Sequence, residues 1–181
     1  MRKTLITLLF LGLTITISGQ GQKRTLEVLV GYSENGHSLM ANLHFYPNEN
    51  TNRFFEIGSF AGFLEERNTG YDISIEVYTL NAGYFTEIAY MSSNDRSFLF
   101  SIGIGGVIGN ESIDLSGIQL SERQFIETKD GVIYGGYGAL RADIAITRHL
   151  SFIGRYTHYY HANSDIGKTK FMLGLGLAIK F

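Results

Sequence analysis

The chain has 181 residues, with 17 acidic and 15 basic side chains that give a formal charge of −2. It contains no cysteine, which excludes lipoprotein processing, a disulfide framework and a thiolate metal site. It has 22 Gly, 11 Tyr and 13 Phe against one Pro and no Trp, a mean hydropathy of +0.03 and no basic stripe of the kind that binds nucleic acid.

The first 19 residues are organised like a Sec signal peptide. Arg2 and Lys3 precede an apolar run over residues 5–17, which ends at the small-residue sequence Ser18-Gly19-Gln20. This run is shorter than the ~20 residues that a membrane-spanning helix needs, so a cleaved signal is favoured over an uncleaved anchor. We therefore predict one mature domain, residues 20–181, with a charge of about −4 once Arg2 and Lys3 are removed.

Eight segments of this domain alternate apolar with small or polar residues, which is the period of a β-strand. In chain order they cover residues 24–33, 37–46, 53–63, 71–88, 97–109, 131–147, 150–160 and 171–181. In the first segment, for example, Val28 and Val30 share one face and Glu27 lies on the other. The only proline, Pro47, falls between the second and third segments, where its missing N–H does no harm.

The fourth segment changes phase. Ile73, Ile75 and Val77 occupy odd positions, whereas the apolar residues from Tyr78 onward occupy even ones. A β-bulge near Val77 and Tyr78 would reconcile the two phases, because one extra residue switches the faces of a strand. Alternatively, the odd-phase part is a strand extension above the membrane.

The later segments complete the pattern. Residues 110–130 form the longest connection and are expected to be an exposed loop, as is the polar stretch 65–70. The final segment places large apolar residues from Phe171 to Phe181 on one face, with glycines, Ala178 and Lys180 among the residues on the other. Phe181 is expected to serve as a recognition residue for outer-membrane assembly.

An apolar outer face with a small or polar inner face predicts an all-β fold, an eight-stranded antiparallel up-and-down transmembrane β-barrel of the outer membrane. Both termini would face the periplasm. The connections after segments one, three, five and seven, longer on average, would form the external loops. Aromatic residues near strand ends are interpreted as two interfacial girdles, or alternatively as ordinary strand formers: Tyr32, Phe45, Tyr46, Phe63, Tyr90, Phe98, Tyr160, Phe171 and Phe181.

Eight strands leave an interior that side chains can fill. The residues predicted to point inward include four acids, three bases and several neutral polar groups: Glu27, Glu56, Glu87, Asp143, Arg141, Arg155, Lys180, Asn42, His44, Asn81, Thr157 and Tyr159. Buried charges need partners, so we interpret this set as a structural network of ion pairs rather than an ion path or a proton relay.

Few residues suggest chemistry. His158 and His161 lie on opposite faces of a strand and cannot easily share a metal. A trio of His158, Ser164 and Asp165 could be drawn for a lipid-modifying enzyme, but such trios arise by chance. The glycine-rich runs 103–109 and 135–138 lack nucleotide-loop spacing. We therefore assign no catalytic, cofactor-binding or metal-binding residue and expect no enzymatic activity.

Five runs in their order and spacing resemble the conjugative transposon TraO family. They are residues 26–32, 80–84, 94–103, 131–136 and 174–176, the last followed by Lys180-Phe181. The resemblance covers essentially the whole mature chain. It implies a signal-bearing outer-membrane component encoded with the mating apparatus that moves integrative elements between Gram-negative cells. It supplies no catalytic motif.

The leading hypothesis is thus a non-enzymatic outer-membrane barrel that serves conjugative DNA transfer in a structural or assembly role. Its expected partners are outer-membrane lipid and other conjugation proteins, without direct contact to nucleic acid. The alternatives are a small surface barrel for adhesion or envelope integrity, and a lipid-modifying barrel enzyme. A soluble lipocalin-like barrel would reverse the two faces, with apolar residues inside.

Overall fold

The computed structural model describes residues 23–34, 36–47, 53–68, 71–114, 131–164 and 167–181. The predicted signal peptide lies outside the described residues. Within them, no helix has the length and apolar character needed to cross a membrane.

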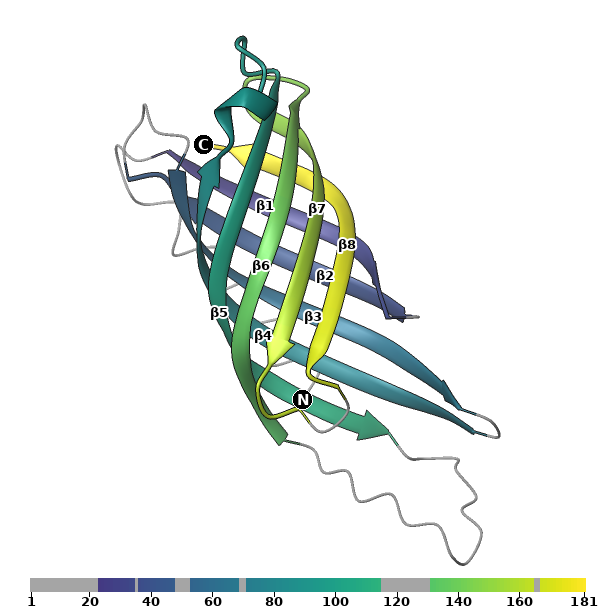
Figure 1. Ribbon diagram of the computed structural model, residues 1–181. Helices are drawn as coiled ribbons and strands as arrows, with labels where there is room; N and C mark the ends of the chain where they lie inside the picture. Colours follow the sequence, from purple (N-terminus) through teal and green to yellow (C-terminus); the bar gives the residue numbers. More distant parts are fainter. Residues whose placement is uncertain (1–22, 35, 48–52, 69–70, 115–130, 165–166) are drawn as a thin grey trace, which may run out of the picture.

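Eight antiparallel strands form one closed barrel in chain order, with β8 returning to pair with β1 (Figure 1). The strands are β1 Arg24–Ser33, β2 Gly36–Phe45, β3 Arg53–Asn68, β4 Tyr71–Glu87, β5 Phe98–Asp114, β6 Gly131–Ala145, β7 Leu150–His161 and β8 Thr169–Lys180, with a 3-10 helix η2 at Ala89–Met91. The predicted up-and-down barrel is confirmed.

The alternation in the sequence becomes the two faces of the wall. In β1, Glu27 and Leu29 are fully buried in the interior, whereas Val28 and Val30 are 45% and 64% exposed on the outside. Every strand contributes large apolar side chains to this outer face, such as Ile104 of β5 and Leu175 of β8. A soluble barrel would expose polar groups there, so the surface suits hydrocarbon.

β4 runs through the predicted phase change without a bulge. Its pairing with β3 is one-to-one from Asn68↔Tyr71 to Arg53↔Thr86, so the bulge near Val77 and Tyr78 is wrong. Ile75 and Val77 are instead buried inside the barrel, at 3% and 0% exposure. The apolar phase changes because these two side chains belong to an apolar cluster inside the barrel, which also includes Leu64 and Ile133. The strand extension that the sequence left open accounts for the pattern.

The wall is taller on one side. β3, β4 and β5 have 16, 17 and 17 residues, against 10 each for β1 and β2. These long strands project beyond their neighbours at the end away from the C-terminus (Figure 1). Consequently β3 continues to Asn68 through the polar stretch that was predicted to be a loop, and β5 continues to Asp114. The rest of that connection, residues 115–130, lies outside the described residues.

The predicted difference in connection length is therefore wrong. Only residues 34–35 and 69–70 separate the strands in the first two connections of the supposedly long set, whereas residues 88–97 separate β4 from β5. The polar stretch 65–70 was predicted to be a loop because its residues are polar. A strand that extends beyond the apolar zone of the membrane can be polar on its outer face, so polarity does not distinguish a strand from a loop there.

Aromatic residues occupy both faces of the wall. Of the predicted girdle, Tyr32, Phe63, Tyr90, Tyr160 and Phe181 are exposed. The girdle prediction is wrong for Tyr46, because this residue packs against the interior cluster, with its ring centroid 5.3 Å from that of Phe54. Phe54, Phe60 and Phe85 are also buried inside, where the sequence suggested mainly polar and small residues.

Candidate functional site

Five charged or titratable side chains meet inside the barrel, at the level where His44 of β2 lies opposite Glu56 of β3. Glu27, His44 and Glu56 come from β1, β2 and β3, and Arg141 and Arg155 come from β6 and β7 on the opposite wall. Each is at most 2% exposed. We call these five residues the lumen network. All five were predicted to point inward.

Two arginines hold the two glutamates of the lumen network. Arg155 donates to Glu56 from Nη1 at 2.6 Å and from Nη2 at 2.8 Å, and Nη1 also donates to Glu27 at 3.2 Å. Arg141 donates from Nε to the second oxygen of Glu27 at 2.6 Å. Such two-nitrogen contacts fix geometry as well as charge. The pairs therefore tie β1 and β3 to β6 and β7 across the interior.

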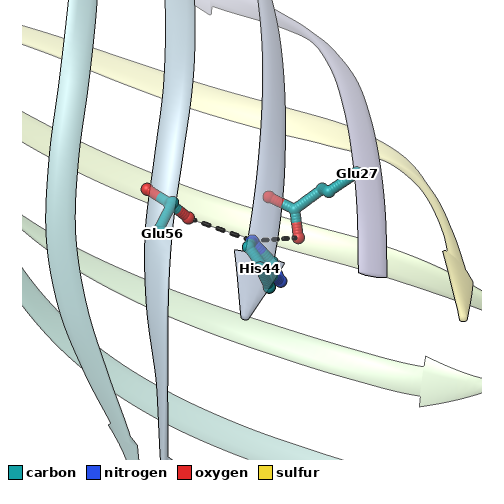
Figure 2. A group of neighbouring side chains, drawn as sticks. All are labelled: Glu27, His44 and Glu56. Atoms are coloured by element: carbon teal, nitrogen blue, oxygen red, sulfur yellow. Dashed lines mark hydrogen bonds and ion pairs between the residues drawn. The ribbon is translucent and has the colours of Figure 1, made fainter. Parts of the chain in front are cut away.

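His44 lies between the two glutamates (Figure 2). Its Nε2 is 3.1 Å from an oxygen of Glu56 and 4.0 Å from one of Glu27. Its ring stacks on Phe54 with the centroids 4.4 Å apart. Within the described residues, its Nδ1 has no hydrogen-bond partner.

Aromatic rings and neutral polar groups complete the surroundings. The guanidinium of Arg141 lies 5.7 Å from the ring centre of Phe54, and that of Arg155 lies 5.0 Å from Phe85. These two inward phenylalanines, which the sequence did not predict, thus cover the arginines. Three further donors and acceptors that were predicted to be inward also join: Asn42 donates to Glu27 at 3.0 Å, Arg155 donates to Thr157 at 3.0 Å, and Asn81 donates to Tyr159 at 3.4 Å.

The interior charges balance, although not in the predicted ratio. Asp143 accepts from Arg141 at 3.2 Å and from Lys180 at 3.3 Å, which adds one acid and one base to the network. Glu87 is only half-buried, and no ion pair joins it to another described residue. Apart from His44, three carboxylates therefore face three cations, where the sequence predicted four against three. The prediction of a paired network is borne out for every member except Glu87.

Three ligand atoms of the network could in principle hold a metal ion. Glu27, His44 and Glu56 place one donor atom each within 4.8 Å of one another, and carboxylate with imidazole is a common donor set. The arginines already occupy these carboxylates, however. A divalent cation would have to displace charge-assisted hydrogen bonds of 2.6 Å and then sit beside two guanidinium groups. The arrangement fits a sealed ion-pair network better than a metal site.

The residues considered for chemistry do not come together. His158 is exposed on the outer face and His161 is buried, as their spacing predicted. Ser164 lies inside and donates to Glu111 at 2.7 Å, so it is on the other side of the wall from His158, and Asp165 lies outside the described residues. Glu111 also pairs with the buried Lys170 at 3.3 Å. This second ion pair was missed, because Glu111 was assigned to a loop.

Known proteins with the same architecture resemble this chain. The family model of conjugative transposon protein TraO matches residues 24–181. No match was found among curated protein sequences.

Solved structures share the fold at low identity. Neisserial surface protein A has a TM-score of 0.61 at 13% identity, covering 90% of this chain and 98% of that one. A major outer membrane protein from Thermus thermophilus has a TM-score of 0.59 at 13% identity, with coverages of 90% and 100%. The attachment invasion locus protein Ail of Yersinia pestis has a TM-score of 0.55 at 10% identity, with the same coverages. These identities show the fold alone.

Proposed function

Because the chain belongs to the conjugative transposon protein TraO family, we propose that it is a non-enzymatic outer-membrane component of a conjugative DNA-transfer apparatus, with a structural or assembly role. The observation that carries this proposal is the family match over residues 24–181, which spans all eight strands. The fold agrees with it, since an eight-stranded barrel with an apolar exterior belongs in an outer membrane.

The packed interior supports a structural role rather than transport. Large side chains fill the barrel across its width, among them Arg141, Tyr159 and Met172, all at most 2% exposed. Eight strands enclose little more than their own side chains, so a passage for DNA has no room here. The surface and the two ends of the barrel are then what remain available to partners.

Export and orientation form part of the same proposal. Residues 1–19 would direct export as a Sec signal peptide and be removed. β1 begins and β8 ends at the same end of the barrel, and we propose that this end faces the periplasm. The tall hairpins of β3, β4, β5 and β6 would then project outside the cell. Other conjugation proteins are the proposed partners, reached without direct contact to nucleic acid.

Gene deletion tests this function. Deleting the gene from the conjugative element should lower the transfer frequency, and wild-type protein supplied in trans should restore it. The donor's growth and detergent sensitivity serve as controls, because a general defect in envelope integrity would change both. Unchanged transfer with the protein verified as absent would overturn the proposal, whereas a defect in adhesion or envelope integrity alone would favour a general surface barrel.

A further inference from the structure

A cavity opens at the end of the barrel where β1 begins and β8 ends. Its volume is about 320 Å³, at the lower end of the range of about 300–1,000 Å³ typical of small-ligand pockets. It adjoins the lumen network at Arg141, and the other four residues of the network do not line it. Arg141 and Asp143 form part of its lining, and both are 2% exposed.

The lining of this cavity is strongly basic. Six lysines and arginines line it against two acids: Lys23, Arg24, Arg96, Arg141, Arg148 and Lys180 against Glu87 and Asp143. A terminal carboxylate at Phe181 would raise the acids to three and still leave an excess of positive charge. The chain as a whole carries −2, so this excess is local and opposite in sign to the net charge.

The paired charges in the cavity do not remove the excess. Asp143 is shared between Arg141 and Lys180, and Arg141 also donates to Glu27 of the lumen network. These contacts account for Arg141 and Lys180, and the remaining basic residues of the lining still outnumber Glu87, its other acidic side chain. Lys23 and Arg148 are both exposed there, and no ion pair joins Arg148 to another residue in the described part of the chain.

Apolar groups make up much of the remaining wall. Phe54 belongs to the interior cluster and Tyr46 packs against it, whereas Leu99 comes from β5 and Phe181 follows β8. Low-dielectric walls around charges of one sign concentrate the electrostatic potential in a cleft. A small anion would find several donors here together with apolar surface against which to pack.

We propose that this cavity binds an anionic ligand that carries two or more carboxylate or phosphate groups. Several converging cations on long side chains suit such a ligand, because each group can meet a separate guanidinium or ammonium. Glu87 also lines the cavity and would repel a negatively charged group placed beside it, so the anionic groups of the ligand should lie near the basic residues. The inference does not depend on a role in DNA transfer, and its failure would leave the proposed function standing.

Titration of the purified full-length barrel in dodecyl maltoside, an uncharged detergent, tests the proposal. Inorganic pyrophosphate and citrate serve as probes of the phosphate and carboxylate classes, with isothermal calorimetry in phosphate-free buffer as the readout. Saturable binding of at least one probe is expected. Affinity should fall with added salt, because exposed charges are screened over about 10 Å at 0.1 M.

A double variant separates the cavity from the general surface. Lys23→Glu with Arg148→Glu reverses two exposed rim charges and should weaken binding by roughly tenfold or more. Arg53→Glu with Lys168→Glu makes the same change in net charge at two exposed residues outside the cavity lining, and should leave affinity unchanged. Heat-modifiable gel mobility verifies that both variants fold.

Each outcome decides the question. Binding of one probe only assigns the ligand to that chemical class, and binding of both supports the shared chemistry. The absence of saturable binding to either probe overturns the proposal. Equal weakening in the two double variants also overturns it, since binding would then follow net charge and not the cavity.

Discussion

Replacing Glu56 by glutamine should expose the energetic role of the lumen network. The carboxylate accepts from Arg155 at 2.6 and 2.8 Å and from the Tyr137 hydroxyl at 3.0 Å, and it lies 3.1 Å from His44. Glutamine keeps one acceptor oxygen, but it places an amide NH₂ group, which can only donate, where the second carboxylate oxygen accepted a hydrogen bond. The interior then carries one unbalanced positive charge, and Arg155 retains its contact with Glu27 at 3.2 Å.

The expected cost follows from that imbalance. Removing one partner of a buried pair costs roughly 3–5 kcal/mol, and the remaining contact of Arg155 with Glu27 places Glu56→Gln near the lower limit, at about 3 kcal/mol. Glu76→Gln is the matched control, because it makes the same substitution at an exposed residue of β4 that accepts a hydrogen bond from Tyr78. That variant should lie within about 0.5 kcal/mol of wild type.

Urea unfolding of the barrel in phospholipid vesicles, followed by far-UV circular dichroism, measures both variants. The chain has no tryptophan, so indole fluorescence is not available as a probe. Arg155→Gln and the double variant Glu56→Gln/Arg155→Gln complete a cycle, in which the double variant should lose less than the sum of the singles by up to about 3 kcal/mol. If Glu56→Gln is as harmless as Glu76→Gln, the network does not stabilise the barrel and the reasoning fails.

Two further measurements examine the wall and a turn. A Cβ at Gly83 would overlap the Tyr137 hydroxyl, so Gly83→Ala should cost about 1–3 kcal/mol in the same unfolding assay; Gly138→Ala, where a Cβ meets no atom within 4 Å, should not destabilise, and equal effects would contradict the predicted clash. In the β4–β5 connection, hydrogen bonds from Ser93 and Ser97 lower the pKa of Asp95 to about 2. A lowered pKa means that this carboxylate stabilises the turn above its ordinary pKa of about 3.9, and that the contribution is lost as the pH falls toward 2. An NMR titration should find a higher midpoint in Ser93→Ala, and an unchanged midpoint would refute this cause.

The outer face could be predicted from the sequence because lipid imposes one requirement on every outward residue. Val28, Ile104 and Leu175 satisfy it in three different strands, and a period of two in the sequence is enough to find them. The interior imposes no such uniform requirement. Where Phe54 or Val77 points inward, both faces are apolar and the alternation loses its phase, which is why β4 suggested a bulge that does not exist.

The membership of the lumen network could also be predicted, but not its pairing. Glu27, Glu56 and Arg155 stand at inward positions that alternation identifies. Which acid meets which arginine depends on the stagger between strands far apart in the chain: Arg155 and Glu56 are separated by 99 positions, and Arg141 and Glu27 by 114. Closure of the barrel fixes that stagger, and no local pattern encodes it. The basic cavity was missed for the same reason, since its lining comes from strand ends and turns.

The lumen network and the cavity meet at Arg141 but should respond to different changes. Inside the lumen network, Glu27 and Glu56 neutralise Arg141 and Arg155, so the network has no excess of positive charge to attract a ligand. At the cavity rim, Lys23 and Arg148 are exposed and add little to stability, because exposed charges contribute at most about 1 kcal/mol. Glu56→Gln should therefore lower stability with little change in anion affinity. Charge reversal at Lys23 and Arg148 should lower anion affinity with little change in stability. A loss of both properties in either variant would show that the network and the cavity act as one unit.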